Sequence, residues 1–330
     1  MGRYFGRKLA IYALTFVVAV TINWLIPRFM PGDPVRTMVA RAGLQDASGV
    51  AAMREYYTEL FGFDLPWWQQ YLNFWGELFR GNFGVSLWAY PKSVSGIILE
   101  ALPYTLGLLL PAILLSWWAG NRFGAYAARK KVLDNTVLPA WYVLTATPYM
   151  WLAILLAWAL GKVAGLFPVG RSFSASLEPS FSWLFVTDLI SHWFLPFLSL
   201  FLVMFGGWAI GMRNMVIYEL EADYAHYLGA LGAPGKLVRR YAFRNAVLPQ
   251  VTGLALQLGV IVGGAVVTEI VFDYRGLGYL VLEAIKSSDL FLLQGVFLFI
   301  VIGVLLANFV IDVVYVLVDP RTRVGMGSGS

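Results

Sequence analysis

The stretch FLLQGVFLFIVIGVLLANFVIDVVYVL, residues 291–317, decides the fold class, because Asp312 is its only charged residue. A helix of this length, rising about 1.5 Å per residue, exceeds the roughly 30 Å hydrocarbon core of a bilayer. Five further runs share this character, so the sequence predicts an all-α polytopic membrane protein with six transmembrane helices. The predicted spans are Leu9–Phe29, Leu102–Ala127, Asn135–Leu160, Trp193–Met212, Pro249–Val271 and Phe291–Leu317.

The composition supports the same class. Of 330 residues, 59% are hydrophobic and 13% are charged, and the mean hydropathy is +0.69. A soluble domain carries about 25% charged residues. There are no cysteines, which excludes disulfides, thiolate metal sites and a cysteine nucleophile. His192 and His226 lie far apart, which argues against a zinc or di-iron site and against an intramembrane enzyme.

The basic residues predict the orientation of the chain. The first apolar run is too long for a signal peptide and is followed by Pro-Arg-Phe at 27–29, so we expect an uncleaved span. With a cytoplasmic N-terminus, the inner segments hold fourteen Lys and Arg against five acids, the outer segments hold ten against thirteen, and Asp312 lies within the last span. This satisfies the positive-inside rule and puts both termini in the cytoplasm. Topology therefore explains the net charge of +5, and no nucleic-acid partner is expected.

The spans imply four regions. Residues 1–30 hold the N-terminus and first helix, 31–100 an extracytoplasmic segment, 101–318 a five-helix core with an inner loop at 213–248, and 319–330 a cytoplasmic tail. The final Gly-Ser-Gly-Ser of the tail reads as an artificial linker. The aromatic-rich segment 31–100 predicts amphipathic helices on the membrane surface, with an aromatic belt at the lipid interface as an equal alternative.

The inner loop carries the most specific pattern. Residues 219–236 read ELEADYAHYLGALGAPGK and residues 238–249 read VRRYAFRNAVLP. The pattern predicts a polar helix that ends at Gly232, a basic helix, and Pro249 in the first turn of the fifth span. Such a helix–turn–helix is too polar for lipid. We therefore expect it on the cytoplasmic face, where it offers a short helix to a soluble partner.

This loop resembles the inner-membrane permease subunits of ATP-binding-cassette importers, in the dipeptide, oligopeptide and nickel branch. The family has an Ala-x-x-x-Gly core followed by Arg-Asn and Leu-Pro, although Leu231 stands where members usually carry a basic residue. Further similar motifs follow in the family's order through the chain. They are Pro31-Gly-Asp-Pro34, Gly81-Asn-Phe-Gly-Val-Ser86, Leu102-Pro-Tyr-Thr-Leu106, Glu269-Ile-Val-Phe272, Gly276-Leu-Gly278 and Asp319-Pro-Arg321.

The resemblance implies the type I importer permease fold, in the B-type permease of a pair, in a bacterial or archaeal cytoplasmic membrane. It implies a second homologous permease in a heterodimer, two ATPase subunits that bind ATP and Mg, and an extracytoplasmic substrate-binding protein. This chain would have no cofactor and no catalytic site; Leu237 follows Gly235-Lys236 where a P-loop needs Ser or Thr. The residues implied to couple it to the ATPase are Asp223, Tyr224, Ala230, Gly232, Lys236, Arg244 and Asn245.

Polar side chains within the predicted spans are candidates to line a translocation path, because such groups are costly in lipid. For the amides, hydrogen bonding between helices is the commoner role. We take Gln257, Glu269, Asn308 and Trp208 as the predicted path residues. The resemblance implies short peptides as cargo, with oligosaccharides, nickel or glutathione as alternatives. A secondary transporter is a remote alternative, because no inverted repeat and no mid-span acid is evident.

Overall fold

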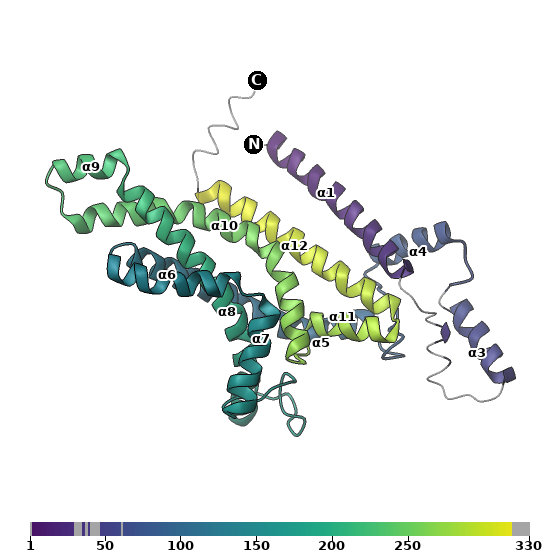
Figure 1. The fold of residues 1–330 in the computed structure, drawn as a ribbon. Coiled ribbons are helices and arrows are strands. Elements are labelled where there is room, and N and C mark those ends of the chain that lie inside the picture. The colour runs from purple at the N-terminus through teal and green to yellow at the C-terminus, as the bar shows by residue number, and fades with distance from the viewer. Residues whose placement is uncertain (1, 30–34, 37–38, 40–46, 61, 319–330) are drawn as a thin grey trace. The chain divides into compact units, whose positions relative to one another are not determined.

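The structure is a computed structural model that describes residues 2–29, 35–36, 39, 47–60 and 62–318. Within these residues the regular structure is helical, apart from one isolated bridge between Val85 and Ser93 (Figure 1). The prediction of an all-α fold is confirmed. The chain divides into two units, one of residues 1–103, 276–306 and 319–330, and a second of residues 104–275 and 307–318.

The first unit contains a small core to which three helices contribute. Ile98 of α5, Ala284 of α11 and Leu292 of α12 are fully buried there. The unit's elements are α1 (Gly2–Leu25), η1 (Ile26–Phe29), α3 (Ala47–Leu60), α4 (Trp67–Phe79), α11 (Leu277–Ser287), and the first parts of α5 (Val94–Ala127) and α12 (Leu290–Val318).

A buried carboxylate fixes the start of α12 in this unit. Asp289 Oδ1 accepts a hydrogen bond from the Leu292 amide at 2.9 Å, which caps the helix. Asp289 Oδ2 accepts hydrogen bonds from Ser86 Oγ at 2.5 Å and from the Trp88 amide at 2.8 Å. Asp289 thus connects the loop that contains Ser86 and Trp88 to the start of α12.

The second unit packs its helices at short distances. Its core includes Leu108 of α5, Leu200 of α8 and Phe272 beyond α10. Two small residues four positions apart, as in Gly120-x-x-x-Gly124, predict a close contact between helices. The structure confirms it, because a Cβ atom added at Gly124 of α5 would lie 2.2 Å from the Ala209 carbonyl of α8. The side chains of the similar pair Gly259-x-x-x-Gly263 lie outside the described residues. The unit's further elements are α6 (Lys131–Ala146), α7 (Tyr149–Leu156), η2 (Ala157–Val163), α8 (Trp183–Leu220), α9 (Asp223–Ala230) and α10 (Gly235–Val271).

The third predicted span is not one straight helix. The helical segments Lys131–Ala146 and Tyr149–Val163 meet at an angle of 104°. Thr147 between them has the extended dihedrals φ −77° and ψ 124°. Proline disfavours the helical region for the residue before it, so Pro148 accounts for the break. The prediction of a continuous helix over Asn135–Leu160 was wrong.

The described residues contain four helices long and apolar enough to cross a membrane, and the bent pair is a fifth if it crosses as one span. The four are Lys8–Leu25, Val94–Ala127, Trp183–Leu220 and Leu290–Phe309. The remaining predicted span, 249–271, forms the second part of α10, and because the side chains of residues 255–264 lie outside the described residues, this list of spans does not test it. The count of six therefore stays a prediction.

Pro249 does not begin a helix. It lies inside α10, which starts at Gly235 and continues for 37 residues, so the prediction that Pro249 stands in the first turn of a helix was wrong. An interior proline removes one backbone hydrogen bond and costs about 3 kcal/mol. Packing offsets this cost, because Ala246 of α10 is buried against Met212 and Val216 of α8. The predicted basic helix and the predicted fifth span are therefore parts of one continuous helix.

Candidate functional site

The short helix α9 lies where the long helices α8 and α10 are joined (Figure 1). It ends in a Schellman motif: the Ala233 amide donates to the Leu228 carbonyl at 3.0 Å, and the Gly232 amide donates to the Gly229 carbonyl at 3.0 Å. Gly232 has φ +76°, the left-handed conformation that this motif requires. The predicted helix end at Gly232 is confirmed.

The carboxylate of Glu219 joins the three helices of this loop. Tyr224 Oη of α9 donates to Glu219 Oε2 of α8 at 2.7 Å, and Asn245 Nδ2 of α10 donates to the same oxygen at 3.0 Å. Tyr224 and Asn245 were both predicted site residues, and the structure brings them together. Glu219 was not predicted, because sequence spacing alone did not show that one oxygen would accept from both.

The surroundings of Tyr224 keep its phenol protonated. Burial of the ring, followed by its hydrogen bond to the Glu219 carboxylate, raises the pKa of Tyr224 from 10.0 to about 12. The phenol therefore remains a donor at any physiological pH. We call the three side chains Glu219, Tyr224 and Asn245 the loop brace.

The other predicted coupling residues form the outer surface of the loop. Ala225 is the buried residue of α9, at 5% exposure. Around it, Tyr227 and Leu231 are about two-thirds exposed, at 66% and 65%. The predicted residues that lie exposed on this surface are Asp223, Ala230, Gly232, Lys236 and Arg244.

An ion pair joins the helices α6 and α8. Arg213 donates to Asp134 through both Nε, at 2.9 Å from Oδ1, and Nη2, so the contact is bidentate. The two side chains are largely buried, with 24% and 12% exposure. Sequence reasoning counted both among the charges of the inner segments but did not pair them. The sequence offered one signal for the pair, because the two opposite charges stand at the ends of two predicted spans that face the same side of the membrane in the predicted topology.

The predicted path residues occupy different environments. Glu269 is fully buried and accepts a hydrogen bond from Thr105 Oγ1 at 2.7 Å. Trp208 is 6% exposed, and its ring packs against Gly253. Asn308 of α12 is half-buried. The side chain of Gln257 lies outside the described residues.

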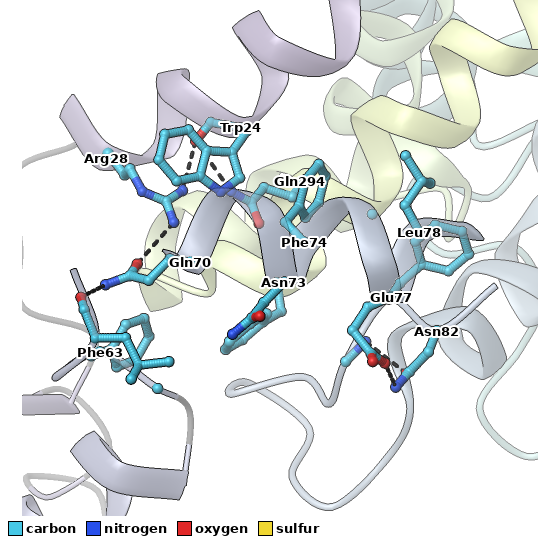
Figure 2. Close-up of a pocket in the computed structure, with 16 residues that line it drawn as sticks. Trp24, Arg28, Phe63, Gln70, Asn73, Phe74, Glu77, Leu78, Asn82 and Gln294 are labelled. Atoms are coloured by element: carbon cyan, nitrogen blue, oxygen red, sulfur yellow. Dashed lines mark hydrogen bonds between the residues drawn. The ribbon is translucent and has the colours of Figure 1, made fainter. Parts of the chain in front are cut away.

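The first unit holds a cavity of about 200 Å³ between α1, α4 and α12 (Figure 2). Arg28 lines one part of it, and Glu77 lines another. Its walls are mostly apolar and include Trp24, Phe74 and Phe291. Sequence reasoning did not find this cavity, because its residues come from segments as distant as 24 and 294.

Comparison with known proteins identifies the family to which the chain belongs. Residues 120–324, which include α9 and both long helices, match the family described as binding-protein-dependent transport system inner membrane component. The chain belongs to this family. It is an inner-membrane permease component of an ATP-binding-cassette importer, and the resemblance seen in its motifs is confirmed.

Relatives match over nearly their whole length. The di/tripeptide transport system permease protein of Pseudomonas aeruginosa (strain UCBPP-PA14) is 29% identical over 98% of this chain and 99% of its own. The oligopeptide transport system permease protein of Bacillus subtilis (strain 168) is 28% identical over 97% and 99%. A probable D,D-dipeptide transport system permease protein of Escherichia coli (strain K12) is 29% identical over 96% of each.

Proposed function

We propose that the chain is the B-type permease subunit of a peptide importer and forms one half of the path for short peptides. The observation that carries this proposal is the likeness, over 96% or more of the chain, to permeases named for dipeptides, tripeptides and oligopeptides. The thirteen tryptophans would suit stacking on sugar rings, but tryptophan is also typical of the lipid interface, so they do not place oligosaccharide before peptide as cargo.

The partners and topology follow from the same assignment. The path lies between this chain and a second, homologous permease, and an extracytoplasmic protein delivers the peptide. Two separate ATPase subunits bind ATP and Mg, and this chain carries no catalytic site. Both termini and the loop 213–248 lie in the cytoplasm, and residues 31–100 lie outside. The charge distribution of the segments supports this orientation.

The loop surface around α9 docks on an ATPase subunit. Asp223, Ala230, Gly232, Lys236 and Arg244 form the docking face, and the loop brace holds α9 at a fixed angle to both long helices. Because α8 is one helix of 38 residues, a displacement of α9 moves the membrane-embedded part of α8 with it. ATPase closure is thereby converted into a rigid-body movement between two discrete states.

The test is ATP hydrolysis and uptake by the reconstituted complex with its binding protein, against a peptide panel and an oligosaccharide panel. We expect di- to oligopeptides to stimulate hydrolysis and to accumulate inside the vesicles. Stimulation by oligosaccharides alone would contradict the peptide assignment. Hydrolysis of ATP by this purified chain alone would contradict the division of labour.

A further inference from the structure

The cavity of the first unit holds a positive charge in a fixed position at one end. The Arg28 guanidinium lies 3.4 Å from the centre of the Trp24 ring. Its Nη1 donates to the Trp24 carbonyl at 2.7 Å, and its Nη2 donates to Gln70 Oε1 at 3.0 Å (Figure 2). Gln70 is itself fixed, because its Nε2 donates to the Leu65 carbonyl at 2.8 Å. These contacts use only some of the five N–H donors of a guanidinium.

A negative charge lies further along α4. Glu77 accepts a hydrogen bond from Asn82 Nδ2 at 2.5 Å and one from the exposed side chain of Arg80 at 2.9 Å. Gln70, Asn73 and Glu77 are spaced i, i+3 and i+7 along α4, so they share one helix face, and all three line the cavity. Seven residues of helix rise about 10 Å. The cavity is therefore dipolar, with its charged groups roughly two helical turns apart.

We propose that this cavity binds a short peptide of about three residues with free termini, its α-carboxylate on Arg28 and its α-ammonium group on Glu77. The inference rests on the proposed function and names a cargo site within it. An extended chain spans about 3.3–3.6 Å per residue, so three residues cover about 10 Å, the separation of Gln70 and Glu77 along α4. A guanidinium suits a carboxylate because its planar donors can bind both oxygens.

The groups between the charges suit the middle of such a peptide. Asn73 lies between Gln70 and Glu77 on the lining face, and its carboxamide offers a donor and an acceptor to a peptide group. The apolar rings of Trp24, Phe74 and Phe291 form walls that accept side chains of different shapes. The site would therefore recognise the termini and the backbone of a peptide rather than its sequence.

A phospholipid headgroup fits the same cavity less well. An anionic headgroup attracted to Arg28 would be repelled by Glu77. A zwitterionic headgroup places its phosphate and its amine much closer together than two turns of helix. Peptide binding and lipid binding are separable by experiment.

The experiment measures binding of radiolabelled trialanine to the assembled complex in lipid nanodiscs, without binding protein or nucleotide. N-acetyl-trialanine and trialanine amide serve as competitors. We expect saturable binding of trialanine, with each capped peptide at least about tenfold weaker. Glu77→Gln should abolish the preference for a free amine and keep the preference for a free carboxylate. Arg28→Gln should do the reverse.

The matched control is Glu100→Gln, which neutralises an exposed carboxylate paired with Lys92 at 3.8 Å and absent from the cavity lining. It should bind all three peptides as the unchanged protein does. Equal binding of free and capped peptides, or the same losses in Glu100→Gln, would overturn the inference. So would a bound phospholipid that Arg28→Gln removes and trialanine does not displace. Peptide uptake with the binding protein is measured in parallel: uptake without cavity binding overturns only the inference, whereas absence of peptide uptake contradicts the proposed function.

Discussion

A single oxygen atom, Glu219 Oε2, accepts hydrogen bonds from two different helices of the loop 213–248. Hydrogen bonds to a charged acceptor contribute about 1.5–3 kcal/mol, roughly twice the value for neutral pairs. The carboxylate therefore does more to fix the angle of α9 than the surrounding exposed side chains can. We therefore expect Glu219 to act as a positioning residue for the proposed docking face, which it does not itself form.

Replacing Glu219 by Gln keeps the size of the side chain but removes the charge from the acceptor. We expect transported peptide per ATP hydrolysed to fall about tenfold, the factor that corresponds to ~1.4 kcal/mol, while the complex still assembles. The measurement is uptake and hydrolysis in the same proteoliposomes. The control is Glu221→Gln, because Glu221 is an exposed carboxylate two residues away. An equal effect in both variants would remove the special role of Glu219.

The phenol of Tyr224 gives the loop brace a defined pH dependence. The pKa of Tyr224 is raised from 10.0 to about 12, so its stabilising contribution is fully present below pH 10 and is lost as pH rises through about 12. We expect the absorbance of one tyrosinate, obtained by subtracting a Tyr224→Phe titration, to appear well above pH 10. Coupling should not change between pH 6 and pH 9 through this group. A tyrosinate that appears near pH 10 would mean that the phenol is not held as described.

At the scale of an element, the end of α9 depends on backbone conformation rather than on packing. Gly232 has φ +76°, and a Cβ atom added there would meet nothing within 4 Å. The cost of a side chain is therefore the left-handed conformation itself, about 1–2 kcal/mol for most residues and less for Asn. We expect Gly232→Asn to retain most transport and Gly232→Val to lose most of it.

The same position also tests the docking face. Gly232→Trp should abolish transport while leaving membrane insertion intact, because a large side chain would block the ATPase. Uptake and membrane insertion of the three variants are measured together. Full uptake in the Trp variant would remove the docking assignment, and equal uptake in the Asn and Val variants would remove the conformational argument.

The Asp134–Arg213 ion pair connects two elements, because Asp134 belongs to α6 and Arg213 to α8. Arg213 lies in the part of α8 that leads to the loop 213–248. Removing one partner leaves a largely buried charge uncompensated, which costs more than removing both. We expect Asp134→Asn and Arg213→Gln each to lower the thermal stability of the purified complex. The double variant should lose less than the sum of the two. Additive losses in this double-mutant cycle would show that the two charges do not interact energetically.

Across the whole molecule, periodicity and motif order predicted what depends on local sequence. The apolar runs predicted helices, Gly232 predicted a helix end, and the small residues Gly120 and Gly124 predicted a close helix contact. Features that depend on tertiary packing were not predictable in this way. Pro249 lies inside a helix because packing of Ala246 offsets its cost, and the hydrogen bonds of Glu219 join residues up to 26 positions apart.

The bent pair of α6 and α7 leaves one question about the whole molecule, namely whether the chain crosses the membrane there or turns back. If it crosses, the loop 164–182 lies outside; if it turns back, this loop lies on the same side as Arg129. The chain has no cysteine, so single cysteines can report their side without background. With Lys92→Cys as the outside control and Lys236→Cys as the inside control, we expect Glu178→Cys to react with an impermeant maleimide in intact cells. Reaction of Glu178→Cys only after permeabilisation would instead make the pair a re-entrant loop and would overturn the six-span topology.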